Sequence, residues 1–150
     1  MQQKTDEYRL IGSPMETSCG VVLVNLGSVL LLQYPQGHWD LPKGHVEQDD
    51  SDNYETARRE LKEETGISEL SFIENFEHRT EYQFKHKGKR RIKQVYWYIA
   101  TTEQISISLS KEHRSYMWLD WEQALEQATH AETKELIKSA QEFVKSVGLD

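Results

Sequence analysis

The sequence has 150 residues, a hydrophobic content of 37% and a formal net charge of −7 at pH 7. This length and composition suit one domain over residues 1–150, and the negative charge argues against a generic attraction to nucleic acid or to an anionic membrane surface. The single cysteine, Cys19, excludes an internal disulfide and fits a reducing cytosol. Residues 1–17 lack the apolar core of a signal peptide, so we expect an N-terminal extension or edge strand of a cytoplasmic protein.

The chain opens with a predicted hairpin. Aliphatic residues at 19–24 and 29–33 flank turn residues 25–28, as in paired buried strands. Residues 34–42 are rich in Pro, Gly and aromatic side chains, a composition typical of a loop that places side chains at a pocket mouth.

A helix is predicted next, from Tyr54 to Glu64. Asp52 or Asn53 would be its N-cap, and Gly66 would end it. Residues 67–73 should then re-enter the sheet.

The second half predicts a long hairpin with a charged tip. Aromatic and β-branched residues at 76–84 and 94–101 stand on either side of a basic segment, 85–93, which is the one local patch that could attract an anion. Residues 105–109 read as a further short strand.

The chain closes with two predicted helices. A capping-box pattern at Asp120 opens a helix to about Ala128, and residues 131–147 have the 3.6-residue apolar spacing of a closing helix. Together the elements predict an α/β fold with a mixed sheet and helices on both faces.

Three glutamates, Glu60, Glu63 and Glu64, fall within one turn of the predicted 54–64 helix. Residues three and four apart are neighbours on a helix, so these like charges destabilise it unless a cation lies between them. A hard divalent ion that prefers oxygen ligands, Mg²⁺ or Mn²⁺, would turn the repulsion into coordination.

Residues 59–67, preceded by the turn Pro42-Lys43-Gly44, resemble the Nudix box. Its pattern of Arg-Glu, an aliphatic residue, any residue, Glu-Glu, any residue, Gly and an aliphatic residue is matched at every specified position. The spacing from Gly44 to Glu60 is one residue longer than in the pattern, so the first glutamate of the box falls at Asp50 or Ser51. An ungapped match would put His45 at the glycine position, and we favour Gly44 because a surface turn tolerates an added residue.

The resemblance implies the α/β/α sandwich of the Nudix fold and metal-dependent hydrolysis of a nucleoside polyphosphate. It makes Glu60 and Glu64 metal ligands, with the backbone carbonyl of Gly44 completing the shell. Glu63 would be a supporting ligand or the partner of Arg59. Lys43 would lie near the phosphates, and His45 could contact a phosphate oxygen.

A second segment, residues 109–119, resembles the Leu-Ser-x-Glu-His-x-x-Tyr-x-Trp segment of asymmetrical diadenosine tetraphosphate hydrolases, a branch of the Nudix superfamily. The resemblance makes Glu112 a candidate general base and Tyr116 a stacking partner of adenine. The water could instead be activated by a box glutamate, so Glu63 and its partner Arg59 are also candidate catalytic residues. We expect Tyr116 and Trp118 to face opposite ways, with Trp118 in the core.

The predicted hairpin supplies the remaining candidate residues. Tyr82 or Phe84 could form a second stacking wall, against an equal chance of lying in the core. The cations of the tip would be solvated or would hold the distal phosphates or a second nucleotide; they include Lys87, Lys89, Arg90 and Arg91.

The sequence therefore predicts a Mg²⁺- or Mn²⁺-dependent hydrolase that converts diadenosine tetraphosphate to ATP and AMP. Its partner would be a small nucleotide, with no membrane, and with nucleic acid limited to an RNA 5′ end. The alternatives are a pyrophosphohydrolase of RNA 5′ ends or nucleoside triphosphates, a diphosphoinositol polyphosphate phosphohydrolase, and a non-catalytic nucleotide-sensing module.

Overall fold

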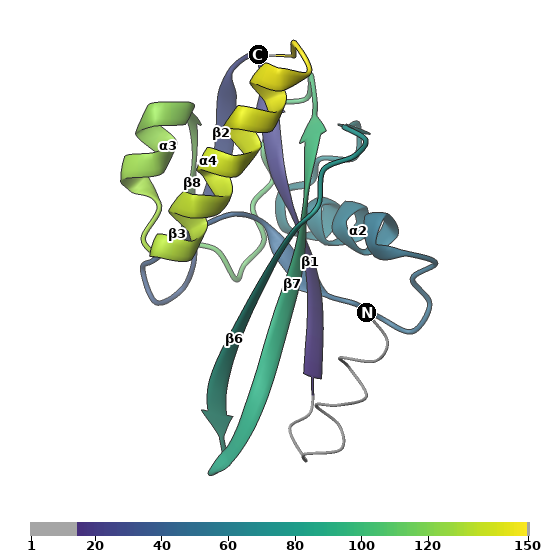
Figure 1. Cartoon of the computed structure of the whole chain (residues 1–150), viewed down its shortest axis with the longest axis vertical. Helices are drawn as coiled ribbons and strands as arrows, with labels where there is room; N and C mark the ends of the chain where they lie inside the picture. The colour runs from purple at the N-terminus through teal and green to yellow at the C-terminus, as the bar shows by residue number, and fades with distance from the viewer. Residues whose placement is uncertain (1–14, 150) are drawn as a thin grey trace.

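Two long strands, β1 and β7, form the centre of the sheet because both are runs of β-branched, aliphatic and aromatic residues. β1 spans Met15–Asn25 and β7 spans Lys89–Thr101. They pair in parallel from Met15 opposite Ile92 to Val24 opposite Thr101. The structure is a computed structural model that describes residues 15–149, and Figure 1 shows both strands running along its long axis.

The other elements are, in chain order, β2 (Ser28–Gln33), β3 (Trp39–Asp40), β4 (Lys43–His45), α2 (Asn53–Thr65), β5 (Ser71–Phe72), β6 (His78–His86), β8 (Ser115–Asp120), α3 (Trp121–Gln127) and α4 (Ala131–Ser146). The strand order is β3-β2-β1-β7-β5, with β4 paired to β1, β6 to β7 and β8 to β2. No helix within residues 15–149 is long and apolar enough to cross a membrane.

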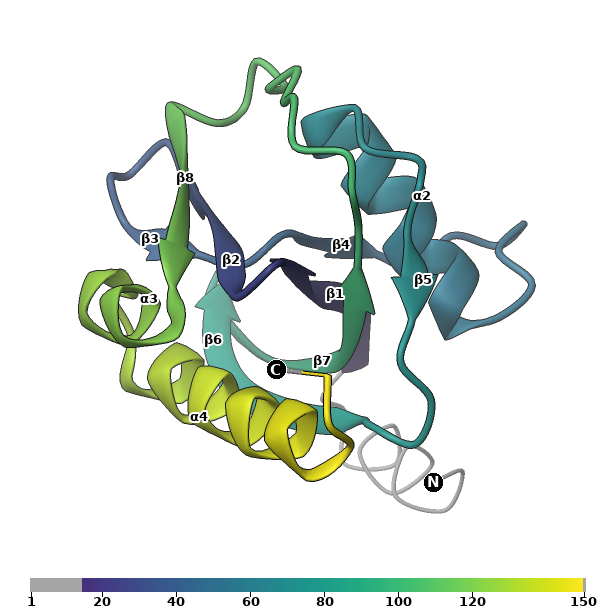
Figure 2. The same cartoon turned by 90° about the horizontal axis from the view of Figure 1, so that it is seen from above.

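Helices cover both faces of the sheet, with α2 on one side and α3 and α4 on the other (Figure 2). The core under α3 and α4 includes Val22, Val95, Trp97, Leu136 and Ile137. The core under α2 includes Cys19, Val21, Leu23, Leu61 and Ile67. Consecutive residues of β1 alternate between the two cores. The predicted α/β/α sandwich with a mixed sheet is confirmed.

The predicted caps of α2 are both present. The side chain of Asp52 accepts a hydrogen bond of 2.9 Å from the Glu55 amide, which settles the choice between Asp52 and Asn53. Gly66 ends the helix with φ of 78°, and its N–H donates to the Lys62 carbonyl. The capping box at Asp120 opens α3 as expected.

The hairpin differs from the prediction in its turn, which is much shorter than the segment 85–93. β6 and β7 continue through the basic residues and are joined only by Lys87 and Gly88, at φ of 52° and 75°. A two-residue turn with positive φ at both positions matches the twist of the flanking strands, so the pairing of β6 with β7 continues up to the turn.

The segment 105–109 is not a strand, contrary to the prediction. Its neighbourhood lies along the end of α2, where the Ser108 and Ser110 amides donate to the carbonyls of Thr65 and Glu64. These donors are therefore satisfied by a helix end and not by a sheet. Of the predicted 67–73 strand, only β5 pairs with β7. Met15–Thr17 form the start of β1, and residues 1–14, on which most of the expected N-terminal extension falls, lie outside the described residues.

Candidate active site

Glu60 and Glu64 lie one turn apart on the side of α2 that faces the sheet. The pairing of β4 with β1 places Gly44 opposite Cys19, and therefore on the α2 side. A Cβ atom added to Gly44 would lie 1.9 Å from the Cδ and Oε1 atoms of Glu60. The Glu60 carboxylate thus rests against the Gly44 backbone in space that any side chain at position 44 would fill.

The carboxylate of Glu64 is buried, with only 8% of the residue exposed. Burial, with a further contribution from Glu60, raises its pKa to about 8. Its Oε1 atom has no hydrogen-bond partner among the described residues, while Oε2 lies 3.9 Å from Nε2 of His113. A buried carboxylate oxygen without a donor is costly, and a cation would satisfy it.

Glu60, Glu64 and the Gly44 carbonyl offer hard oxygen donors of the kind that Mg²⁺ and Mn²⁺ prefer, so the residues present fit a divalent ion. The carboxylate of the third glutamate, Glu63, does not join this group of oxygen donors. The exposed Glu63 carboxylate lies 3.3 Å from Nη1 of Arg59, one of the two roles expected for it. Within residues 15–149, no three acidic, histidine or cysteine side chains already converge on one point.

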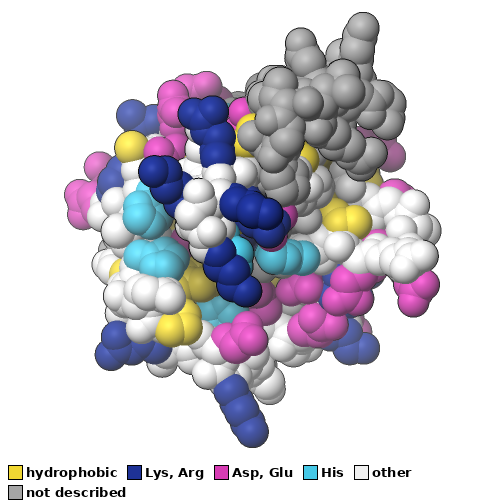
Figure 3. Space-filling model, turned by 90° about the horizontal axis from the view of Figure 1, so that it is seen from below, with side chains coloured by type: hydrophobic (Ala, Val, Ile, Leu, Met, Phe, Trp, Pro, Cys, Tyr) yellow, Lys and Arg dark blue, Asp and Glu magenta, His cyan; other side chains and the backbone are white. Residues whose placement is uncertain are grey.

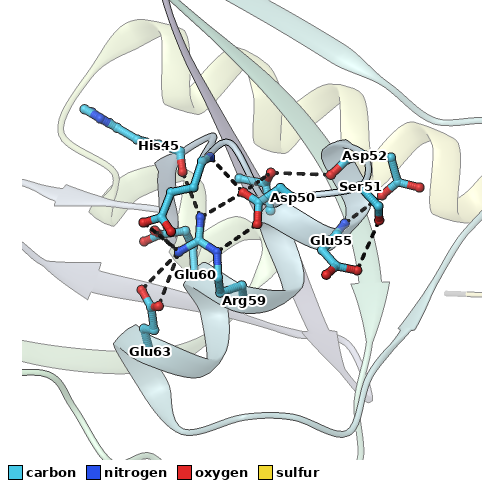
Figure 4. Close-up of polar contacts among 10 residues, drawn as sticks. His45, Asp50, Ser51, Asp52, Glu55, Arg59, Glu60 and Glu63 are labelled. Carbon is cyan, nitrogen blue, oxygen red and sulfur yellow. Dashed lines mark hydrogen bonds and ion pairs between the residues drawn. The ribbon is translucent and has the colours of Figure 1, made fainter.

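Arg59 holds the turn, the helix and β4 together (Figure 4). Its Nε and Nη2 atoms donate to the two carboxylate oxygens of Asp50, each at 3.0 Å. Nη1 donates to Glu60 at 2.8 Å, and Nη2 donates to the His45 carbonyl at 2.9 Å. Arg59 therefore holds the Glu60 carboxylate in one position.

Asp50, not Ser51, is the partner of Arg59. Its carboxylate also accepts hydrogen bonds from Thr56 Oγ1 and from the Glu47 amide. These donors, Arg59 first, hold the pKa of Asp50 well below its usual range, and the Asp50 carboxylate in turn raises the pKa of Arg59. Ser51 instead points outward to Glu55. The extra residue of the turn is absorbed without loss of this pair.

A cavity of about 330 Å³ opens on the opposite face of the sheet, beneath α4. Its aromatic wall is made of Tyr82 on β6 and Trp97 on β7, and Trp97 Nε1 donates to Thr80 Oγ1 at 3.2 Å. The lining residues are His38, Asp40, Lys43, Thr80, Tyr82, Val95, Trp97, His130, Glu132, Thr133 and Leu136.

Lys43 connects this cavity to the carboxylates. Its side chain lines the cavity, its Nζ atom lies 5.5 Å from the centre of the Tyr34 ring, and its ammonium opposes the rise in the pKa of Glu64 that burial causes. Lys93 of β7 lies beside it, and burial together with the Lys43 ammonium lowers the pKa of Lys93 to about 8. Two adjacent ammonium groups create a place for an anion.

The NUDIX domain model matches residues 15–140. The chain belongs to the Nudix family. Its relatives include the mouse bis(5′-nucleosyl)-tetraphosphatase [asymmetrical], 40% identical over 78% of this chain and 80% of that one. The Caenorhabditis elegans enzyme of the same name is 35% identical over 77% and 83%.

Solved structures agree with this Nudix assignment. The binary complex of a C. elegans Ap4A hydrolase superposes with a TM-score of 0.69 at 29% identity, covering 87% of this chain and 98% of that one. A MutT protein from Methanosarcina mazei superposes with a TM-score of 0.65 at 27% identity, covering 89% and 97%.

Outside the Nudix box, the expected residues fall in three places. Tyr82 lines the cavity, and Phe84, Arg91 and Lys89 continue along the same hairpin. Glu112 is exposed on the loop that packs against the end of α2, close enough to contribute to the raised pKa of Glu64.

The third place is β8, where the expectation that Tyr116 and Trp118 face opposite ways is wrong. Residues two apart on a strand share a face, and these two pair with Leu32 and Leu30 of the core under α2. Trp118 packs against that core, as expected, while Tyr116 is 41% exposed and does not line the cavity.

Sequence reasoning missed Trp97 and His38, which line the cavity, and Lys93, which lies beside Lys43. Lys93 was hidden in a run of basic residues. The available signal was alternation, since Lys93, Val95 and Trp97 occupy every second position of one strand.

Proposed function

We propose that this chain hydrolyses diadenosine tetraphosphate asymmetrically, to ATP and AMP, with Mg²⁺ or Mn²⁺ as its metal. The observation that carries the proposal is the position of Lys43, which lines the aromatic cavity and lies near the buried Glu64 carboxylate. The names of the mouse and C. elegans relatives support the choice of substrate.

One adenosine would occupy the cavity beneath α4. A volume of about 330 Å³ is in the range of small-ligand pockets, and the Tyr82 and Trp97 rings offer apolar surface to a base. Lys43 and Lys93 at its edge would hold the adjoining phosphates, and Lys89 and Arg91 the distal ones. His45 contributes its backbone carbonyl to Arg59, so a contact of its side chain with phosphate stays a secondary expectation.

The reacting phosphate would lie between Lys43 and the box carboxylates. Glu60, Glu64 and the Gly44 carbonyl would hold the metal, which neutralises phosphate charge and makes water more acidic. Arg59 and Glu63 keep Glu60 in place. Glu112, carried by an exposed loop, would take the proton of the attacking water. Tyr116 stays a candidate contact to the second nucleoside.

We further propose that the Nudix domain is the working unit and acts in the cytoplasm. The free, buried thiol of Cys19 is compatible with a reducing compartment.

The test is a substrate panel with Mg²⁺ in ¹⁸O-labelled water, with products separated by chromatography. We expect ATP and AMP from the tetraphosphate, with the label in one product only. The panel would also hold triphosphorylated RNA, nucleoside triphosphates and a diphosphoinositol polyphosphate.

Two results would overturn the proposal. Release of pyrophosphate or phosphate from the other substrates, with the tetraphosphate intact, would select one of the pyrophosphohydrolases. Nucleotide binding by calorimetry without turnover of any substrate would select a sensing module, for which the retained Glu60, Glu63 and Glu64 would be unexpected.

A further inference from the structure

The hairpin of β6 and β7 extends beyond the rest of the described sheet (Figure 1). The first described residue of β1, Met15, pairs with Ile92, so the hairpin beyond that point is a two-stranded ribbon within the described residues. Its last pairs are Phe84 with Arg91, Lys85 with Arg90, and His86 with Lys89.

The register sorts the side chains of this ribbon into two different faces. Residues at alternate positions share a face, so the face that continues from the cavity carries rings on β6 and cations on β7. Each ring lies directly opposite a cation: Tyr82 with Lys93, Phe84 with Arg91, and His86 with Lys89. We refer to these six residues as the ladder. The reverse face carries Lys85 opposite Arg90 and no aromatic ring at the tip.

Among the described residues, no carboxylate neutralises the charges at the end of the ribbon. No described carboxylate lies within ion-pairing distance of Lys85, Lys89, Arg90 or Arg91. The Nε atom of Arg91 is buried without a hydrogen-bond partner in the described residues. Figure 3 shows Lys and Arg side chains gathered on this end of the molecule, with histidines beside them.

Such an arrangement has a cost. Lys89, Arg91 and Lys93 occupy alternate positions on one face of β7, so their like charges repel one another along the ladder in a chain of net charge −7. A polyanion would remove that repulsion, and the rings identify which polyanion fits. Rings repeat along β6 at about 6.8 Å, twice the rise per residue, and base stacking on such rings is how proteins hold single strands without regard to sequence.

We propose that the ladder binds single-stranded nucleic acid, with bases on Tyr82, Phe84 and His86 and phosphates on Lys89, Arg91 and Lys93. The nucleic-acid strand would end at the cavity, because Tyr82 belongs both to the ladder and to the cavity lining. Tyr82, Lys89, Arg91 and Lys93 also belong to the proposed nucleotide site, so a strand would compete with the tetraphosphate, but binding of the strand does not require the box carboxylates.

Fluorescence anisotropy of a labelled oligouridylate that spans the hairpin tests the proposal. EDTA is added so that no turnover occurs and the result does not depend on the hydrolytic function. Phe84→Ala should weaken binding by about 5- to 150-fold, the effect of one lost stacked base. Phe84→Leu keeps apolar bulk without the ring and should weaken binding similarly, which separates stacking from misfolding.

A matched pair of double variants separates the ladder from general electrostatics. Lys89→Ala with Arg91→Ala removes two ladder cations, and Lys85→Ala with Arg90→Ala removes two from the reverse face of the same ribbon. The first should reduce the slope of log K against log salt by about 1.4, two phosphate contacts at about 0.7 each. The second should leave most of the slope in place.

Three results would overturn the proposal. Equal losses in the two double variants would mean diffuse attraction to any polyanion. Full binding by Phe84→Leu would exclude stacking. Affinity for the oligouridylate no greater than for a dinucleoside tetraphosphate would mean that the ladder serves a second nucleoside of a small substrate and not a strand.

Discussion

Two glycines of this chain lie against other atoms so closely that neither position has room for a Cβ, yet the neighbours differ in kind. At Gly44 the neighbour is the far end of the flexible Glu60 side chain. At Gly20 it is the Trp97 ring, at 2.3 Å, and the Pro42 carbonyl, at 2.8 Å. Glu60 can move aside and the Trp97 ring cannot. Gly44 therefore leaves room for Glu60, a proposed metal ligand, and Gly20 leaves room for the packed Trp97 ring.

Gly44→Ala should fold and lose at least about 10-fold in Mn²⁺ affinity and in turnover, because Glu60 is displaced from the metal position. Gly20→Ala should instead lower the free energy of unfolding by about 1–3 kcal/mol through overpacking. Calorimetric Mn²⁺ titration and thermal denaturation of both variants measure these effects. Unchanged Mn²⁺ affinity in a folded Gly44→Ala protein would contradict the role of Gly44.

The buried Glu64 predicts an unusual pH dependence. Its folded-state pKa of about 8 lies above its ordinary value of 4.5, so between these pH values the folded state holds a proton that the unfolded state has released. The free energy of unfolding of the metal-free protein should therefore fall as pH rises through this window, by up to about 1.4 kcal/mol per pH unit. Below pH 4.5 this contribution is constant.

Denaturant unfolding at several pH values in EDTA measures this slope. Glu64→Gln should flatten it, and it should lower turnover by orders of magnitude while the fold survives, as should Glu60→Gln. Saturating Mg²⁺ should also flatten the wild-type slope. A Glu64→Gln protein with the wild-type slope, or with near wild-type rates, would contradict the assignment of Glu64.

At the scale of elements, the ion pair of Arg59 with Asp50 joins the 46–52 turn to α2. Asp50→Ala should lower kcat/KM by about 10- to 100-fold, since Arg59 would no longer hold Glu60 in one position. Ser51→Ala is the matched control, because Ser51 points outward, and it should have wild-type kinetics. Equal kinetics in the two variants would show that Asp50 is not needed.

Elements defined by local chemistry were predicted well. The caps at Asp52, Gly66 and Asp120 depend on residues within one turn, and the hairpin of β1 and β2 depends on its own turn. The 105–109 segment was mispredicted because its backbone donors are satisfied by α2, which is distant in sequence. Propensity describes a residue's own preference and not the partner that folding brings to it.

The sequence grouped the box carboxylates, but of the residues that line the cavity it named only Lys43 and Tyr82 as candidates. The box carboxylates follow from a single helix, so their spacing is visible in the sequence. The cavity requires the register of β7 with both β1 and β6, and a shift of one residue would send Lys93 and Trp97 to the other face. That register is a property of the folded sheet, which is why Lys93 was not selected.

For the whole molecule, we expect the face of the sheet under α4 to bind the nucleotide base and the face under α2 to carry the metal-dependent chemistry. Tyr82→Ala should raise KM for the tetraphosphate by about 5- to 150-fold, because Tyr82 lines the cavity and a stacked base contributes about 1–3 kcal/mol. Tyr82→Phe keeps the ring and should retain most of the affinity. Tyr116→Ala should raise KM less, since Tyr116 lies outside the cavity.

Steady-state kinetics of the three variants decide which tyrosine holds the base. A larger rise in KM for Tyr116→Ala than for Tyr82→Ala would move the adenine site to the α2 side of the sheet.

β4 has only three residues, and its alternation assigns a different task to each of the first two. Lys43 pairs with Gly20 and faces the cavity, while Gly44 pairs with Cys19 and faces the glutamates. The chain carries its extra residue just beyond this strand, in an exposed turn. An extra residue between Lys43 and Gly44 would instead place both residues on the same face of the sheet. One of them would then no longer face its proposed partner, the nucleotide for Lys43 or the metal for Gly44. Length variation among proteins built on this plan should therefore be frequent after β4 and rare within it.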